Sequence, residues 1–342
     1  MQLMRTCLVL TVVFCISMGS SPAQRITTLV GGPGNGRPAT SAPVFNPATI
    51  AKDAAGNMYF GEGYSHTVRK IDAVTGIVSR FAGNGIMGNS GFGGPAVDAQ
   101  LNSPIGVATD AQGNVYISDN SANGVFKVDL AGIITRIAGT GSSGFGGDGG
   151  PATSAALSPH DLFVTPSGDI YVTDQTAKRV RKISGSTGII TTVAGGGASG
   201  GPTENVVATS ASLGYVSGVY VDAANNIFVC EYERYRILMI NGTTGMLTVV
   251  AGSGASGDSG DGGLATSATF GFPLEVIKDQ NGDLLISDNQ RIRKVNMTTG
   301  IITAFAGSGD QFAQYVEGAS PLQAKLGGVQ GLPGYSGSQG RL

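Results

Sequence analysis

The stretch from Leu101 to Gly139 reads LNSPIGVATDAQGNVYISDNSANGVFKVDLAGIITRIAG. It contains four short apolar segments, which are Ile105–Thr109, Asn114–Ser118, Val125–Val128 and Ile133–Ala138. Residues typical of turns, mainly Asp, Asn and Gly, separate each segment from the next. Because short strands joined by such turns form antiparallel meanders, we predict a four-stranded sheet for this stretch.

The same stretch recurs along the chain. Its closing glycines, 55 to 57 residues apart, are Gly83, Gly139, Gly195, Gly252 and Gly307. Four-stranded units repeated radially make the blades of a β-propeller. We therefore predict an all-β propeller of four-stranded antiparallel blades, with five complete blades at about 44–83, 101–139, 157–195, 213–252 and 270–307.

Several motifs within the repeat resemble those of the NHL-repeat family in its bacterial and teneurin-like form. The matching motifs are PIGVA at Pro104–Ala108, GNVYISD at Gly113–Asp119, RVRKI at Arg179–Ile183 and TGIITTVAG at Thr187–Gly195. The resemblance covers nearly all of 25–331 and implies a propeller that typically has six blades. It implies little about activity, because one scaffold carries many functions.

The two ends of the repeat region suggest an incomplete sixth blade. Residues 25–31 read as an outer strand without a blade of its own, and 326–332 read as the start of another inner strand. Pairing these two segments in one blade would close the ring, so we assign the propeller to 24–332. The remaining residues, 333–342, do not follow the repeat and are predicted to be an irregular tail.

The first 23 residues read as a signal peptide. Arg5 is followed by an apolar run, and Ser21-Pro22-Ala23 places small residues before a cleavage site. This pattern predicts a secreted, extracellular protein, or a periplasmic one in a bacterium. No later segment is long and apolar enough to span a membrane, so we expect no membrane span in the mature chain.

The composition argues against a nucleic-acid partner. Charged residues make up 13% of the chain, the formal net charge is −2, and Lys and Arg form no run. Binding to phosphate backbones needs a basic surface, so we expect an extracellular protein or glycan as the partner. The sequence carries no signal for a particular oligomeric state.

One column of the inner strands varies between repeats. His160, Asp161 and Glu275 fall where other copies have Ile105, Gly106 or similar small and apolar residues. Inner strands line the channel of a propeller, so these three residues are candidates for a ligand or cation site at the channel mouth. The alternative is that they are ordinary solvated groups of the channel.

About 17 Gly-rich residues form a spacer between each closing glycine and the next inner strand, as in Thr140–Ala156. We expect the spacers to cross one face beside the channel mouth, either as a partner surface or as a packing motif that buries Ala152, Thr153 and Ala155. Asp148 and Asp261 recur in GDGG within two spacers. One Asp per spacer is too few for calcium, so we expect no cofactor and keep Ca²⁺ as the alternative.

Acidic residues also recur at the end of each second strand. We interpret them as structural, because an Asp at this position can accept backbone N–H groups of the following turn. Two Asn-x-Thr sequons, at Asn241 and Asn296, fall in the turn before the fourth strand and are candidate glycosylation sites in a eukaryotic source. The acidic residues are Glu62, Asp119, Asp174, Glu231 and Asp288.

Two functions remain open from the sequence. The first is a non-catalytic binding scaffold that holds a protein or glycan through the Gly-rich loop face. The second is a propeller hydrolase or lactonase with a metal at the channel mouth. The chain has only 2 histidines, so a catalytic zinc site with three His ligands cannot form. We assign no catalytic residue and favour the binding scaffold.

Overall fold

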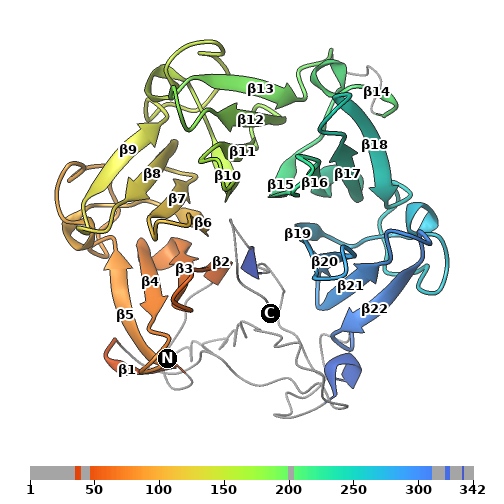
Figure 1. Ribbon diagram of the computed structural model, residues 1–342, viewed down its shortest axis with the longest axis horizontal. Helices are drawn as coiled ribbons and strands as arrows, with labels where there is room; N and C mark the ends of the chain where they lie inside the picture. Colours follow the sequence, from red (N-terminus) through yellow and green to blue (C-terminus); the bar gives the residue numbers. More distant parts are fainter. Residues whose placement is uncertain (1–34, 40–46, 199–203, 310–319, 324–332, 335–342) are drawn as a thin grey trace, which may run out of the picture.

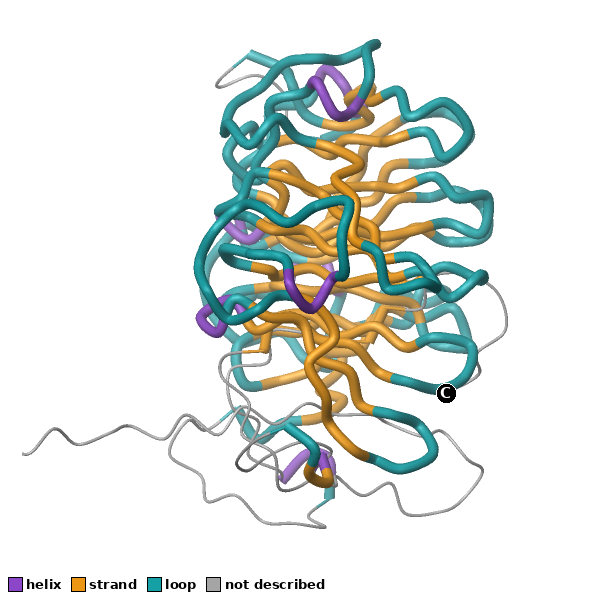
Figure 2. Tube along the Cα trace, turned by 90° about the vertical axis from the view of Figure 1, so that its left-hand side faces the viewer, coloured by secondary structure: helices purple, strands orange, loops and turns teal. Residues whose placement is uncertain are grey.

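The computed structural model describes residues 35–39, 47–198, 204–309, 320–323 and 333–334. These residues form five four-stranded antiparallel blades around a central axis (Figure 1). Seen from the side, the strands form the middle of the ring, and turns and loops lie at both faces (Figure 2). The propeller and its four-stranded blades are thereby confirmed. The predicted sixth blade falls on 25–31 and 326–332, outside the described residues, as does the predicted signal peptide.

Within each blade the strands follow chain order from the axis to the rim. Blade by blade, they are β2 (Pro47–Lys52), β3 (Met58–Glu62), β4 (Thr67–Ile71) and β5 (Ile77–Ala82); β6 (Pro104–Thr109), β7 (Val115–Asp119), β8 (Gly124–Val128) and β9 (Ile134–Ala138); β10 (Pro159–Val164), β11 (Ile170–Asp174), β12 (Arg179–Ile183) and β13 (Ile190–Ala194); β15 (Val216–Val221), β16 (Ile227–Glu231), β17 (Arg236–Ile240) and β18 (Met246–Ala251); β19 (Pro273–Lys278), β20 (Leu284–Asp288), β21 (Arg291–Val295) and β22 (Ile302–Ala306).

Three short strands and single 3-10 turns complete the described elements. The strand β23 (Pro333–Gly334) pairs in parallel with β2, beside the axis. The strands β1 (Arg37–Pro38) and β14 (Val206–Val207) pair with the outer strands β5 and β18. The 3-10 turns are η2 (Gly63–Ser65), η3 (Ala96–Asp98), η4 (Ala152–Ser154), η5 (Ala208–Ser210), η6 (Tyr232–Arg234), η7 (Ala265–Ser267) and η8 (Pro321–Gln323).

The hydrophobic core lies between successive blades. Each large cluster of buried side chains combines residues of two neighbouring blades, and the inner strands of neighbouring blades also contact each other. A large apolar side chain at the end of each described spacer packs into the junction between two blades. These side chains are Leu101, Leu157, Leu213 and Phe270, all 4% exposed or less. Truncating a side chain this deeply buried to Ala typically costs about 2–5 kcal/mol.

The spacers follow a path that the sequence did not predict. Instead of crossing beside the channel mouth, the middle of each spacer runs along the outer edge of the next blade. Pro151 forms a bridge with Ile189, and the Ala152 amide donates to the Gly188 carbonyl. Ala152 and Ala155 are buried, as a packing motif requires, whereas Thr153 is exposed. The expected position was wrong because backbone pairing with a distant strand leaves no side-chain pattern in the spacer.

Candidate binding site at the channel mouth

One mouth of the channel contains a pocket of about 290 Å³. All inner strands begin at this face, and the turns between second and third strands lie at the same face because neighbouring strands are antiparallel. One repeat position supplies a different residue from each of four blades: Ala48, Ile105, His160 and Leu274. The other lining residues are Thr49, Gly63, Tyr64, Ser103 and Glu275.

Each inner strand is irregular where it borders this mouth. The pairing register with the second strand shifts between Pro159 and Leu162, and equivalent shifts occur in the other four blades. A bulge of this kind redirects side chains that would otherwise alternate strictly between two faces. The bulge in β10 therefore brings two consecutive polar residues, His160 and Asp161, to the channel, where they line two adjacent cavities.

Polar side chains of the inner strands join neighbouring blades. Thr49 Oγ1 donates to the Ile105 carbonyl at 3.0 Å and accepts the Val107 amide at 2.8 Å. Asp161 Oδ2 accepts the Val219 amide of the following blade at 3.0 Å. Asp161 therefore has a structural bond as well as a place in the channel.

Two carboxyl groups, from blades 3 and 5, approach each other beside a glycine of blade 4. Asp161 of blade 3 and Glu275 of blade 5 both line a narrow cavity of about 20 Å³ below the mouth pocket. Between them lies Gly218, where an added Cβ would stand 2.8 Å from Glu275 Oε1. Burial raises the pKa of Asp161 to about 7, and burial together with the Asp161 charge raises the pKa of Glu275.

His160 lines the larger pocket beside Glu275. Burial lowers its pKa to about 4, so its imidazole is neutral at physiological pH. Its Nδ1 is buried and has no hydrogen-bond partner in the described structure. The structure thus places His160 with Glu275 in one pocket and Asp161 with Glu275 in the other. Among the described residues, no three His, Cys, Asp or Glu side chains lie close enough together to hold a metal ion.

In blades 2 to 5 the recurrent acidic residues tie the second strand to the segment that enters the blade. Asp119 accepts the backbone amides of Asn102 and Ser103, both at 2.7 Å, and that of Ala122 at 2.9 Å. Glu231 accepts the Gly214 amide in the same way. These bonds hold the ends of the four described spacers beside the mouth, and most of them reach back to the spacer rather than forward to the next turn.

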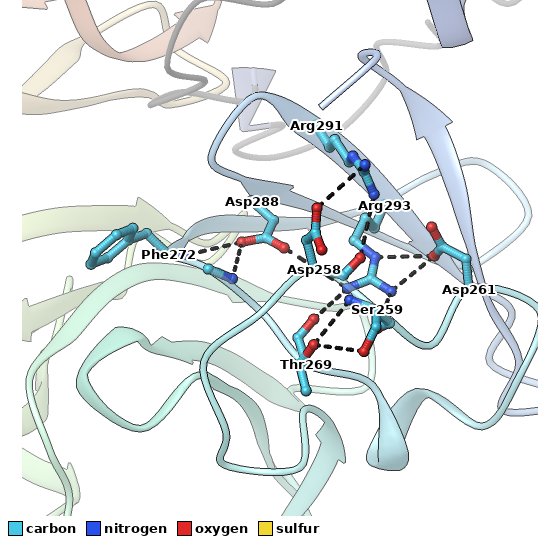
Figure 3. Close-up of polar contacts among 9 residues, drawn as sticks. Asp258, Ser259, Asp261, Thr269, Phe272, Asp288, Arg291 and Arg293 are labelled. Atoms are coloured by element: carbon cyan, nitrogen blue, oxygen red, sulfur yellow. Dashed lines mark hydrogen bonds and ion pairs between the residues drawn. The ribbon is translucent and has the colours of Figure 1, made fainter. Parts of the chain in front are cut away.

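The acidic residues of the GDGG motifs contact buried arginines. Arg293 is fully buried and donates to Asp261 Oδ1 at 2.9 Å and to the carbonyls of Thr269 and Ser259 (Figure 3). Arg293 also lies 3.8 Å from Asp288. Asp148 makes the equivalent contact with Arg181, at 2.7 Å. Both loop carboxylates thus pair with an arginine that fixes a spacer to its blade.

Comparison with known proteins places the repeat in a family. No protein-family model matches the chain. The chain is 25% identical over 317 residues to NHL repeat-containing protein 2 of Bos taurus, a match that covers 81% of this chain and 43% of that protein. It is also 28% identical over 240 residues to teneurin-1 of Mus musculus, covering 60% of this chain and 8% of that protein. The chain is an NHL-repeat β-propeller.

Other similarities are distant and partial. The NHL-repeat propeller is 26% identical over 271 residues to the Arabidopsis thaliana protein SUPPRESSOR OF QUENCHING 1, chloroplastic, covering 74% of this chain and 25% of that protein. The chain therefore spans less than half the length of the curated relatives described here.

Solved structures support the fold alone. A Bacteroides thetaiotaomicron protein of unknown function has a TM-score of 0.67 at 19% identity, covering 92% of this chain and 71% of that one. An auxiliary nutrient binding protein of Bacteroides ovatus has a TM-score of 0.61 at 16% identity, covering 86% and 65%. A gluconolactonase of Xanthomonas campestris has a TM-score of 0.54 at 14% identity, covering 83% and 80%.

Exposed aromatic residues surround the mouth of this NHL-repeat propeller, and the repeat pattern did not single them out. Tyr64 lines the pocket and is 80% exposed. Phe272 is half-exposed at the end of a spacer, and Tyr215, at the equivalent position in blade 4, stacks on Tyr232 with ring centroids 6.0 Å apart. Ser103 holds this position in blade 2, so comparing spacer ends between repeats would have revealed the difference.

The two sequon asparagines of the NHL-repeat propeller lie in turns at the opposite face. Asn241 Oδ1 accepts the amides of Thr243 and Thr244, and Asn296 Oδ1 accepts those of Thr298 and Thr299. Each asparagine thus closes its turn through the amide oxygen. None of the helices in the described part of the chain is long and apolar enough to cross a membrane.

Proposed function

We propose that this propeller is a secreted, non-catalytic binding module that holds an extracellular protein or glycan at its channel-mouth face. The observation that carries the proposal is the mouth pocket of about 290 Å³, with the highly exposed Tyr64 at its edge. Binding pockets combine apolar or aromatic walls with a few polar groups, and Tyr is enriched at interfaces. The spacer ends and the turns between second and third strands contribute to this face, while the middle of each spacer packs at the rim.

Variation among the repeats supports the same face. The acidic residues that support the blades recur, whereas the pocket position changes from Ala48 to Ile105, His160 and Leu274. A pocket whose lining differs from blade to blade suits ligand recognition, because a specific site needs differences between blades. The proposed secretion rests on the signal-peptide pattern of residues 1–23.

The proposal is tested by capture with matched surface variants of the chain from residue 24 onward. Wild-type protein, Tyr64→Ala and Leu130→Ala are immobilised and exposed to the extracellular fraction of the source organism. Leu130 is 76% exposed in the turn between β8 and β9, at the opposite face, and so controls for loss of exposed apolar surface. We expect Tyr64→Ala alone to lose the captured protein or glycan. Equal loss with Leu130→Ala, or no reproducible ligand, would contradict the proposal.

A hydrolase or lactonase would need a chemical centre at the mouth. The described part of the mouth has His160, Asp161 and Glu275, divided between two cavities. No observation on the described residues favours catalysis over binding, so we carry no second function forward.

A further inference from the structure

The mouth pocket has acidic groups without basic neighbours. Glu275 lines both the mouth pocket and the narrow cavity below it, and Asp161 lines the narrow cavity. No Lys or Arg is among the described residues that line either cavity. An anionic ligand would meet two carboxyl groups and no cation here, whereas a cationic ligand would stabilise their ionised forms, so the site favours a cationic ligand.

Glu275 differs from the buried acids that support the blades. Asp119 accepts three backbone amides, and Glu231 accepts an amide and contacts two arginines. Glu275 is 5% exposed, yet its carboxylate receives only the Val276 amide, at 3.3 Å on Oε1. Its Oε2 accepts no hydrogen bond from the described residues. Glu275 Oε2 is not one of the fully buried polar atoms without a partner, so this acceptor is accessible to a ligand that donates hydrogen bonds.

Two further groups in the same pocket fit such a ligand. The buried His160 Nδ1 has no partner, and a neutral imidazole can offer one ring nitrogen as an acceptor. The Tyr64 ring stands at the pocket edge and is 80% exposed. Aromatic faces attract ammonium groups, and they also pack against the alkyl chain that carries one.

We propose that the mouth pocket binds an organic ammonium group, with its nitrogen at Glu275 and its alkyl portion against Tyr64. The ammonium group belongs either to a free amine or to a lysine side chain of a bound protein. An ammonium group supplies three hydrogen-bond donors and one positive charge, and a positive charge beside Glu275 and Asp161 favours the ionised form of both carboxyl groups. This inference rests on the proposed use of the channel-mouth face for binding. A Ca²⁺ ion is a poorer match, since it needs six to eight oxygen ligands.

The binding test uses the chain from residue 24 onward and probes of matched size. Isothermal titration with n-butylammonium, neutral n-butanol and Ca²⁺ separates charge, shape and inorganic cations. We expect n-butylammonium to bind at least tenfold more tightly than n-butanol. Glu275→Gln, which keeps the shape of the side chain, should weaken n-butylammonium binding at least tenfold, and Tyr64→Ala should weaken it severalfold. The matched control is Glu204→Gln, which removes an exposed carboxylate outside both pockets and should leave binding unchanged.

Several outcomes would overturn the inference. These are equal binding of n-butylammonium and n-butanol, unchanged binding by Glu275→Gln, or tight Glu275-dependent Ca²⁺ binding without amine binding. Thermal unfolding of each variant shows whether Glu275→Gln is folded; if it is not, the n-butanol comparison and Tyr64→Ala decide the question. Acetylating the lysines of a captured partner distinguishes the sources, because only a lysine ligand would then be lost. Capture that depends on Tyr64 but that n-butylammonium does not inhibit would leave the proposed function standing and reject the ammonium site.

Discussion

Phe92 stacks on Phe126 with ring centroids 4.4 Å apart, in the spacer and third strand of blade 2. In the aligned repeats of the next blade, the same two positions are held by Asp148 and Arg181, which form an ion pair at 2.7 Å. An aromatic stack and an ion pair between a buried arginine and a partly exposed aspartate therefore perform the same task, which is to hold the spacer against its own blade. The two pairs differ in charge, so a phenylalanine should not be able to replace only one member of the ion pair.

Exchanging this pair tests that equivalence. Arg181→Phe alone leaves Asp148 and the buried Asp174 without their arginine, and we expect it to cost about 3 kcal/mol of unfolding free energy. Asp148→Phe alone should cost less, about 1–2 kcal/mol, because Asp148 is partly exposed and Arg181 keeps Asp174 and the Ala156 and Gly146 carbonyls. The double variant should be more stable than the sum of the two losses predicts, with a coupling energy of about 2 kcal/mol. Chemical denaturation of all four proteins measures this coupling, and strict additivity would contradict the equivalence.

Asp161 should make the propeller less stable as pH rises. Its pKa is about 7 in the folded state because of burial, against 3.8 as its ordinary value, so the folded state holds the proton more tightly than the unfolded state. Stability is therefore lost as pH rises from about 4 through 7. Glu275, His160 and the buried thiol of Cys230 are the other titratable groups nearby.

Asp161→Asn removes this loss while an amide oxygen can still accept the Val219 N–H. We expect its melting temperature, relative to wild type, to be higher at pH 8 than at pH 5. Asp148→Asn provides a control of opposite sign. Burial raises the pKa of Asp148, but hydrogen bonds from Thr192 and Arg181 outweigh burial and lower it overall. A melting-temperature difference for Asp161→Asn that does not change with pH would refute the prediction.

Gly218→Ala should destabilise the junction between blades 4 and 5. The added Cβ would lie 2.7 Å from the Leu274 carbonyl oxygen and 2.8 Å from Glu275 Cα, and these backbone atoms must move. We expect a loss of about 2 kcal/mol, in the range of other overpacking changes. Gly146→Ala is the control, because nothing lies within 4 Å of its added Cβ. Equal unfolding free energies for the two variants would show that the junction tolerates the extra carbon.

Both sequons should be used if the chain passes through a eukaryotic secretory pathway. The amide oxygens of Asn241 and Asn296 close their turns, which leaves each amide nitrogen as the site of glycan attachment. Secreted protein from such cells should lose mass in two steps on enzymatic deglycosylation. Thr243→Ala and Thr298→Ala should each remove one step, whereas Thr244→Ala, one residue beyond the first sequon, should remove none.

The repeat predicted the fold because its information is local. The segments predicted in blade 2 match β6 to β9 to within one residue at each end, because the Asp, Asn and Gly residues of the turns mark where each strand ends. Non-local features were harder to predict. That Asp161 and Glu275 converge depends on a bulge in each inner strand and on a glycine between them in space. The route of the spacers depends on backbone pairing, although the exchange of Asp148 and Arg181 for Phe92 and Phe126 was visible in the aligned repeats.

The separate attachment of each spacer affects how such a protein can change. Arg293 secures one spacer through contacts within its own repeat, and Arg181 secures another in the same manner. A substitution in one spacer is therefore absorbed by a single repeat and need not pass around the ring. Recognition residues at the ends of the spacers can diversify one blade at a time, so evolution or an engineer can alter the specificity of the face without redesigning the disc.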